Sequence, residues 1–202
     1  RGRLKRLSPL ITVGTEPTAV SPDGALHLMQ TSRYDGVFVF GDGTHPTTRL
    51  CAAAVDLLCR QQRGLAVLDV GTGTGVLARI ARARGASFVA ATDTDASALQ
   101  LARDLAAIDG ASVPIHFGRE APDHWGARFE LVVANILEAP LIALAPALAA
   151  ALKPGGTLLI SGFTRAQAPT LRLVFSEAGL NPLRDAASEG WLLLEFTLPQ
   201  KG

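Results

Sequence analysis

The sequence predicts an α/β fold built on a doubly wound, mostly parallel sheet. From Pro46 onward, short apolar runs alternate with longer stretches of helical character, as they do in βαβ units. Residues 67–68 and 131–134 are apolar throughout, which is typical of parallel strands buried on both faces. The last two strand-like runs are joined by a short turn, so we expect them to form an antiparallel hairpin at one edge of the sheet.

The alternation assigns the elements in order along the chain. The predicted helices cover residues 47–60, 76–84, 96–108, 141–152 (which contains Pro146) and 167–178. The seven predicted strands cover residues 66–70, 88–92, 113–117, 131–134, 157–161, 183–187 and 191–198. The first strand ends at a glycine loop, and Asp95 is suited to cap the helix that follows the second strand. Residues 153–156 (KPGG) predict a turn that carries the chain from helix to strand.

Residues 1–43 differ from the rest of the chain. Prolines and glycines recur there and separate short β-like runs at residues 10–13 and 37–40. The segment is too short for an independent domain. We therefore expect an irregular lead-in over residues 1–43 that packs against one domain over residues 44–202.

Length and charge narrow the class of protein. A chain of 202 residues that is 48% apolar can build one domain with a substantial core. Its net charge of +1 gives no strong positive potential that would attract nucleic acid, so strong nucleic-acid binding is not expected. The basic cluster Arg1, Arg3, Lys5 and Arg6 is interpreted as a solvated tail, with an RNA-contacting arm as the alternative.

Membrane, metal and disulfide signals are weak. No segment resembles a signal peptide, and no apolar run reaches the ~20 residues of a spanning helix, so a soluble protein with no membrane partner is expected. Cys51 and Cys59 lack zinc-site spacing and are expected as small apolar residues on a helix. No ligand cluster is evident, so no metal is expected. An absent disulfide framework fits a reducing cytoplasm.

The strongest motif is residues 68–75 (LDVGTGTG), where the first strand passes into a helix. Glycines at such a bend let the backbone turn sharply and approach a ligand closely. A dinucleotide fingerprint needs a third glycine or an alanine at its sixth position, but Val76 stands there, so nicotinamide or flavin binding is disfavoured. A tight turn without a ligand is the structural alternative.

The second strand ends at Asp93, at a spacing after Gly71 that suits an acid accepting hydrogen bonds from ribose hydroxyls. With the turn at residues 153–156 and the terminal hairpin, these features match Rossmann-like class I S-adenosylmethionine-dependent methyltransferases. The expected cofactor is S-adenosylmethionine, with S-adenosylhomocysteine as product. The motif residues assigned to its site are Asp69, Gly71, Gly73, Gly75 and Asp93.

Two further stretches resemble a narrower family. Residues 41–51 (GDGTHPTTRLC) and 132–137 (VVANIL) are similar to the F-G-T-G-T-H-P-T-T and V-A-N-I-L segments of the PrmA family. Members of that family are bacterial methyltransferases that modify amino groups of ribosomal protein L-eleven. The resemblance covers about residues 38–196. Asp42 stands where the family usually has threonine, and it either favours a cationic substrate or shapes the glycine turn.

The resemblance implies cofactor contacts at Thr48, Gly71, Asp93 and Asn135. Thr48 has an alternative role in capping the first predicted helix, together with Thr44 and Thr47. Asn135 follows an apolar strand at the edge where open α/β sheets bind ligands, which suits a residue facing the sulfonium and an incoming amine. Its alternative is a buried amide that caps a strand end.

Two more side chains are candidates for catalysis. His45 is either a general base or a hydrogen-bond partner that orders its loop, and we favour the second interpretation because Pro46 fixes the loop shape. Glu138 either holds the acceptor amine and accepts its proton, or is a solvated carboxylate at a helix start.

The predicted function is methyl transfer from S-adenosylmethionine to amino groups of a protein, either lysine side chains or an N-terminus. The resemblance implies a ribosomal protein as substrate and partner. The alternatives are an enzyme of the same subfamily acting on another protein or a small amine, and a non-enzymatic cofactor-binding module. The family also has an N-terminal substrate-recognition domain. About 37 residues precede the resemblance here, so we expect either that this domain is omitted or that the protein is a shorter relative.

Overall fold

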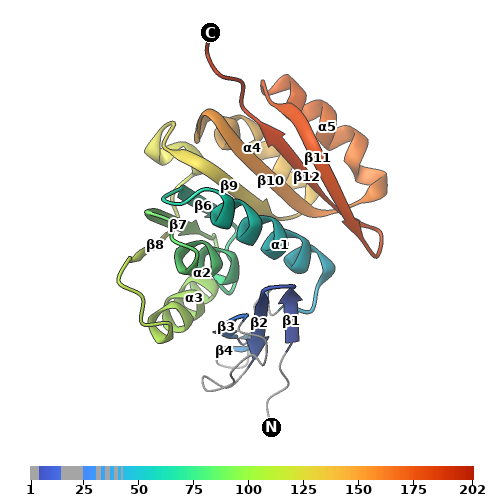
Figure 1. The fold of residues 1–202 in the computed structure, drawn as a ribbon. Coiled ribbons are helices and arrows are strands. Elements are labelled where there is room, and N and C mark those ends of the chain that lie inside the picture. The colour runs from blue at the N-terminus through green and yellow to red at the C-terminus, as the bar shows by residue number, and fades with distance from the viewer. Residues whose placement is uncertain (1–4, 15–24, 31–32, 35–36, 39–40, 42) are drawn as a thin grey trace.

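A central seven-stranded sheet organises the protein in the computed structural model (Figure 1), which describes residues 5–14, 25–30, 33–34, 37–38, 41 and 43–202. Arg1 and Arg3 of the basic cluster and Asp42 lie outside the described residues. The strands are β6 (Ala66–Val70), β7 (Phe88–Thr92), β8 (Ile115–Gly118), β9 (Phe129–Asn135), β10 (Leu152–Thr164), β11 (Asn181–Ser188) and β12 (Trp191–Thr197).

The strand order is β11-β12-β10-β9-β6-β7-β8. Every neighbouring pair from β10 to β8 is parallel, and β12 runs antiparallel to both β10 and β11. The predicted mostly parallel sheet with an antiparallel C-terminal hairpin is thus confirmed. The order reverses at β6, which lies between β7 and β9, and such a reversal opens a crevice at the carboxyl ends of the strands.

Helices cover both faces of the sheet. One core contains α1 (Pro46–Gln61) and α2 (Val76–Ala83), and the other contains α4 (Glu138–Ala150) and α5 (Ala168–Glu177). Successive strand residues point to opposite faces, so Val67 joins the first core and Leu68 joins the second. Burial on both sides explains why these strands are apolar throughout. The remaining long helix, α3 (Ala96–Ile108), lies beside α2 (Figure 1).

Short strands occupy the lead-in, where the sequence predicted irregular chain. β1 (Lys5–Ser8), β2 (Ile11–Gly14) and β3 (Leu26–Met29) form a three-stranded sheet, and β4 (Arg33–Tyr34) pairs with β5 (Val37–Phe38). β2 and β3 are parallel neighbours although ten or more residues separate them. Pairing between distant segments leaves no local pattern, which is why only the runs near β2 and β5 were predicted. The division at residue 43 remains a prediction.

The expected turn at residues 153–156 was wrong, because these residues lie inside β10. Gly155 N donates to Leu198 O at 2.7 Å, and Leu198 N donates to Gly156 O at 3.0 Å, so these two bonds tie the segment to the residue after β12. The change of direction is taken up instead by a bulge, since the register to β9 shifts between Leu152 and Thr157.

Smaller boundary shifts occur elsewhere. α4 begins at Glu138, three residues before the predicted helix, and β8 begins at Ile115 rather than at residue 113. Two short 3₁₀ turns, Pro122–Trp125 and Arg165–Gln167, were not predicted. Cys51 and Cys59 are free and buried in α1, as expected.

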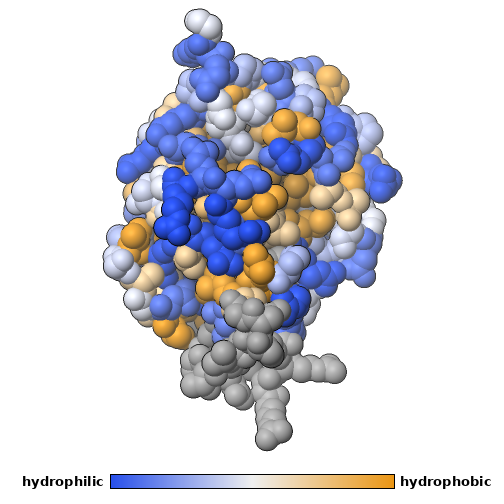
Figure 2. Space-filling model, viewed as in Figure 1, coloured by the Kyte–Doolittle hydropathy of each residue, from blue (hydrophilic) through white to orange (hydrophobic). Residues whose placement is uncertain are grey.

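None of the helices formed by the described residues combines the length and apolar character that crossing a bilayer requires. On the face shown in Figure 2, hydrophobic residues lie in separate patches among hydrophilic ones.

Candidate active site

A cavity of about 760 Å³ opens at the carboxyl edge of the sheet, where β6, β7 and β9 end. Its walls include Gly71 and Gly73 of the glycine loop, Asp93 after β7, Asn135 at the end of β9 and His45 just before α1. The crevice predicted from the strand pattern is therefore present, and its volume lies in the usual range for small-molecule sites.

The glycine loop bends through three left-handed residues. Gly71, Gly73 and Gly75 have φ values of +70°, +55° and +79°, which side-chain-bearing residues rarely adopt. Thr72 N donates to Thr92 O at 2.8 Å, and this bond ties the loop to the end of β7. The bend therefore needs glycine for its backbone geometry as well as for close approach.

Asp93 closes this bend from the neighbouring strand. Its Oδ2 accepts from Gly73 N at 2.9 Å, and its Oδ1 accepts from Asp95 N at 3.0 Å. A carboxylate has about four acceptor positions, so two remain for hydroxyl donors in the cavity. Asp95 also lines the cavity, and its side chain caps α3 by accepting from Ser97 N at 2.9 Å, the capping role preferred from the sequence.

Two of the motif residues support the loop from behind and are not among those lining the cavity. Asp69 is buried, and its Oδ2 accepts from the Thr72 hydroxyl at 2.7 Å. Burial raises the pKa of Asp69 to about 7; the Thr72 hydrogen bond opposes this rise and the nearby Asp93 charge adds to it. A Cβ on Gly75 would approach Ala102 of α3 to 2.9 Å, so this glycine permits close helix packing.

Asn135 carries an unsatisfied acceptor in the cavity wall. Its Oδ1 is buried and has no hydrogen-bond partner within the described part of the chain. A buried amide oxygen normally has a partner, so an unpaired one at a cavity is a position prepared for a donor on a ligand. The backbone of Asn135 is fixed by the pairing of β9 with Ser161 of β10.

Ile136, the residue after Asn135, fits between two glycines. A Cβ on Gly71 would collide with the Ile136 side chain, and a Cβ on Gly162 would collide with the Ile136 backbone. Both glycines have positive φ. The need for glycine at position 71 thus comes from the Ile136 side chain, whereas the sequence pattern suggested close approach of a ligand as the reason.

His45 begins α1 as its N-cap and lines the cavity. Its Nδ1 accepts from Thr47 N at 3.2 Å and lies 2.7 Å from Thr47 Oγ1, and its ring meets Trp191 edge-on with centroids 4.7 Å apart. Burial and the Arg49 charge lower the pKa of His45, while Glu189 opposes them. The capping that the sequence offered to three threonines is performed here by the histidine.

Two other predicted site residues do not appear in the cavity wall. Thr48 is buried one position beyond Thr47, which does line the cavity, and the Thr48 hydroxyl has no partner in the described region. Glu138 is the first residue of α4, where a carboxylate interacts favourably with the helix dipole. Its placement matches the helix-start interpretation.

Trp191 and Glu120 are among the wall residues that sequence reasoning missed. Trp191, at the start of β12, was not chosen as a site residue, yet its ring contacts His45 and both residues line the cavity. Glu120 lies just after β8; its Oε1 is 2.8 Å from His116 Nε2, and its Oε2 is buried without a partner in the described region. An acid three residues after the predicted strand 113–117, on the edge already assigned to Asp93, was the available signal for Glu120.

The sheet order, the glycine bend closed by Asp93 and the crevice at the strand ends define the S-adenosylmethionine-dependent methyltransferase fold. A solved structure that shares it is the N-methyltransferase NodS from Bradyrhizobium japonicum in complex with S-adenosyl-L-homocysteine, with a TM-score of 0.61 and 15% identity over 78% of this chain and 90% of that one. Within this class, the chain belongs to the PrmA family. The family model described as "Ribosomal protein L11 methyltransferase (PrmA)" matches residues 32–199.

Relatives with this description are similar over most of the chain. The protein from Azotobacter vinelandii is 39% identical over 85% of this chain and 56% of its own length. That from Myxococcus xanthus is 38% identical over 88% of this chain and 59% of its own. The crystal structure of ribosomal protein L11 methylase from Lactobacillus delbrueckii subsp. bulgaricus has a TM-score of 0.84 and 26% identity, covering 98% of this chain and 99% of that one. This chain thus spans just over half the length of the curated relatives from Azotobacter vinelandii and Myxococcus xanthus.

Proposed function

We propose that this chain transfers methyl groups from S-adenosylmethionine to amino groups of a protein. The observation that carries the proposal is the unsatisfied Oδ1 of Asn135, buried in the wall of the cavity that Gly73 and Asp93 also line. Family membership supplies the class of reaction, and the orphaned amide oxygen supplies an acceptor for the N–H of an incoming amine.

The residues present fit the cofactor. Gly71 and Gly73 would hold it against the bend, and the free acceptor positions of Asp93 would take the ribose hydroxyls. When bound, S-adenosylmethionine supplies a sulfonium whose methyl carbon is open to nucleophilic attack. The protein's own task is then mainly to position the amine in line with that carbon.

The acceptor nitrogen must be neutral to react. Neutralising a free lysine of pKa about 10.4 at pH 7 costs about 4.6 kcal/mol, at about 1.36 kcal/mol for each pKa unit, whereas an α-amino group near 7.7 needs much less. A partly dry cavity lowers this cost because it disfavours the ammonium. The partly buried apolar residues Leu144 and Trp191 line the same cavity as Asn135 and are proposed to provide such surroundings.

His45 is proposed to order its loop. Because Nδ1 accepts from Thr47 N, the ring proton of the neutral imidazole belongs on Nε2, and no ring lone pair remains to remove a proton from an amine. The lowered pKa keeps the ring neutral at pH 7. We therefore assign the positioning of the amine that accepts the methyl group to Asn135 and the apolar cavity wall.

The proposed substrate is a ribosomal protein in the cytoplasm, because the relatives are named as methyltransferases of ribosomal protein L11. An enzyme of the same subfamily that acts on another protein or a small amine is the alternative. Transfer of labelled methyl groups into a lysate of the source cells, resolved by mass, separates them. Label in the ribosomal protein supports the proposal, label elsewhere supports the alternative, and no label refutes both.

Two variants test the residue roles. We expect Asp93→Ala to weaken S-adenosylhomocysteine binding at least tenfold, since two backbone donors and the ribose lose their acceptor. We expect Asn135→Ala mainly to lower kcat, with nearly unchanged cofactor affinity. Asp104→Ala, on the exposed face of α3, is the matched control and should change neither quantity. Wild-type affinity in Asp93→Ala by calorimetry, or wild-type kcat in Asn135→Ala, would overturn these roles.

A further inference from the structure

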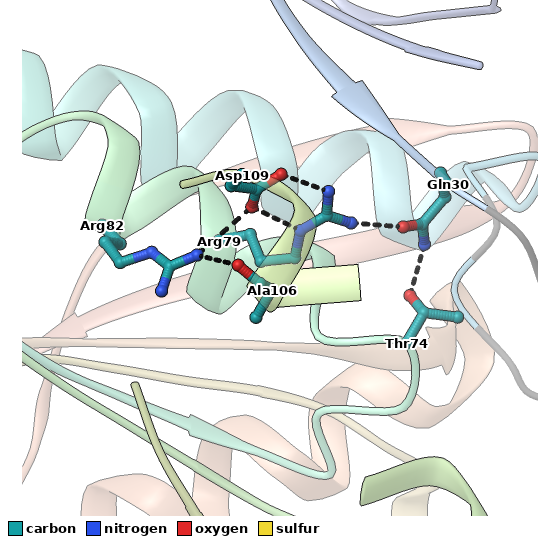
Figure 3. Close-up of polar contacts among 6 residues, drawn as sticks. All are labelled: Gln30, Thr74, Arg79, Arg82, Ala106 and Asp109. Atoms are coloured by element: carbon teal, nitrogen blue, oxygen red, sulfur yellow. Dashed lines mark hydrogen bonds and ion pairs between the residues drawn. The ribbon is translucent and has the colours of Figure 1, made fainter. Parts of the chain in front are cut away.

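A chain of buried polar groups runs from α3 to the glycine loop (Figure 3). Asp109, the C-cap of α3, accepts from Arg79 of α2 through two bonds, Nε to Oδ2 at 2.8 Å and Nη2 to Oδ1 at 2.7 Å. The Arg79 side chain is fully buried. Arg82, one turn further along α2, donates to Ala106 O at 2.7 Å and also reaches Asp109. The arginines of α2 and the end of α3 therefore hold Asp109 and Arg79, at one end of this hydrogen-bond network, in place.

Gln30 is the next residue of this hydrogen-bond network, and it directly follows β3 of the lead-in. Arg79 Nη1 donates to Gln30 Oε1 at 2.9 Å. This bond directs the amide nitrogen the other way, where Nε2 donates to Gly41 O at 2.6 Å and to Thr74 Oγ1 at 2.5 Å. Thr74 Oγ1 in turn donates to Gly41 O at 2.8 Å. Gln30 is only 4% exposed and Thr74 is fully buried, so water does not compete for the bond between these two side chains.

The two groups that Gln30 joins lie next to two different parts of the cavity wall. Thr74 lies in the glycine loop next to Gly73, whereas Gly41 begins the segment that leads to His45 and Thr47. The contact between them is close, because a Cβ on Gly41 would come within 2.9 Å of Thr74 Oγ1. Whatever fixes Gly41 to Thr74 therefore sets the spacing between the glycine loop and the His45–Thr47 segment.

Stability alone gives a poor account of this arrangement. Burying an ion pair costs desolvation that apolar packing would avoid, so buried pairs are often no more stabilising than apolar residues of the same volume. The distinctive effect of a buried polar pair is to fix geometry, since each donor has few other acceptor atoms within reach. In this network the fixed geometry is the orientation of the Gln30 amide.

We propose that Gln30 is a positioning residue for methyl transfer: oriented by the Asp109–Arg79 pair, its amide holds Gly41 against Thr74 and so sets the spacing of the two cavity walls. The proposal rests on the proposed function for its kinetic consequences, but the placement of the Gly41–Thr47 segment can be measured without any substrate. Gln30 does not line the cavity, so it acts through Thr74 and Gly41.

The decisive variant is Gln30→Glu. One carboxylate oxygen still accepts from Arg79, now with charge assistance, so the fold and its thermal midpoint should be retained. The other oxygen replaces the donating nitrogen and faces Gly41 O, which repels it. We expect faster amide hydrogen exchange confined to residues 41–47, a rise of roughly fivefold or more in the Kd for S-adenosylhomocysteine, and a matching fall in kcat/KM.

Arg84→Met is the matched control, because Arg84 forms an ion pair with Asp56, which is buried in α1 ten residues beyond Pro46 and does not line the cavity; Arg84 also donates to Leu10 O. It should lower the thermal midpoint and leave both the exchange of residues 41–47 and the Kd unchanged. A purely structural Gln30 would behave like this control, and that result for Gln30→Glu would overturn the proposal. Failure of the wild-type protein to bind S-adenosylhomocysteine would count against the proposed function, while the exchange measurement would still decide the role of Gln30.

Thr74→Val gives an independent test, since it removes the hydroxyl between Gln30 and Gly41 with little change in volume. If one connected set of bonds fixes the spacing, the effects of Thr74→Val and Gln30→Glu on the Kd are strongly non-additive in the double variant. Simple additivity would show two separate contacts and overturn the proposal.

Discussion

Asn135 and its neighbours show how single residues determine the geometry of the candidate site. The β9–β10 pairing fixes the Asn135 backbone, but the loop that follows depends on the space left by two glycines. Ile136 occupies that space, with its side chain against Gly71 and its backbone against Gly162. The position of the Asn135 amide is therefore sensitive to a single added methyl group on either side.

Gly162→Ala tests this sensitivity. The new Cβ would meet the Ile136 carbonyl carbon at 2.7 Å, and alanine disfavours the φ of +102° at this position. We expect kcat to fall more than tenfold because Asn135 shifts, together with a loss of roughly 2–4 kcal/mol in unfolding free energy. The matched control is Gly179→Ala, which has a φ of +93° but open space around its Cβ. It should lose stability only through its backbone strain and retain kcat; equal kcat values in the two variants would contradict the argument.

Asp69 predicts a pH dependence of stability. Burial raises its pKa in the folded protein from 3.8 to about 7, so between these values the folded state holds a proton that the unfolded chain releases. Stability from this group is therefore full below about pH 4, falls as the pH rises through that window and is constant above about pH 7. Asp69→Asn keeps an oxygen for the Thr72 hydroxyl and removes the titration.

Urea unfolding at pH 5 and pH 8 checks this prediction. The unfolding free energy of Asp69→Asn relative to the wild type should be higher at pH 8 than at pH 5, by about 1 kcal/mol or more. Asp104→Asn, an exposed carboxylate on α3, should show no such difference. A relative stability of Asp69→Asn that is the same at both pH values would mean that Asp69 is ionised in the folded protein throughout the range.

At the scale of elements, the sequence predicted what local signals determine. The strands β6 and β7 and the helix α3 have the predicted bounds, because each is an apolar run delimited by glycines, polar turns or a capping residue such as Asp95. The expected turn at residues 153–156 failed because a residue distant in sequence, Leu198, bonds to Gly155 and Gly156, and the segment is part of β10. A local glycine–proline signal carries no information about such partners.

The candidate site was predictable to a similar degree. Gly71, Gly73, Asp93 and Asn135 follow strand ends, so the topology alone brings them to one edge. Motif membership was less informative about the direction of a side chain: the resemblance implied Thr48, whereas its neighbour Thr47 lines the cavity, and the Thr48 contact stays a prediction. The Gln30 network joins three segments far apart in the chain, and no spacing rule could have revealed it.

Pro146 interrupts the hydrogen bonding of α4 and gives a prediction at this scale. Proline inside a helix removes one backbone donor and its ring presses on the preceding turn. Because Pro146 is exposed, Pro146→Ala should raise the unfolding free energy by about 1–3 kcal/mol in thermal denaturation. Pro169→Ala, in the first turn of α5 where the donor is unpaired in any case, should change it by less than about 0.5 kcal/mol. Equal effects at both positions would show that Pro146 costs α4 no stability.

For the molecule as a whole, the lead-in is part of the main core. Leu7, Ile11, Val13 and Leu28 share one buried cluster with α1 and α2. Gly43 extends this contact toward the site, since its Cβ position lies 3.1 Å from Val13 and 3.2 Å from Leu7. The three-stranded lead-in sheet therefore packs against Gly43, shortly before His45. Gln30, directly after the last strand of this sheet, joins Gly41 to Thr74 of the glycine loop. We infer from both contacts that β1, β2 and β3 unfold together with the seven-stranded sheet.

Ile11→Ala tests this cooperativity. The Ile11 side chain is fully buried, so its truncation should lower the unfolding free energy by about 2–5 kcal/mol and shift a single thermal transition to lower temperature. Leu10→Ala, at a side chain 41% exposed, is the adjacent control and should cost less than about 1 kcal/mol. Calorimetry and circular dichroism should report the same midpoint for Ile11→Ala, because one core is being weakened. A separate early transition in that variant, with the main one unmoved, would show that the lead-in is an independent unit docked on the methyltransferase fold.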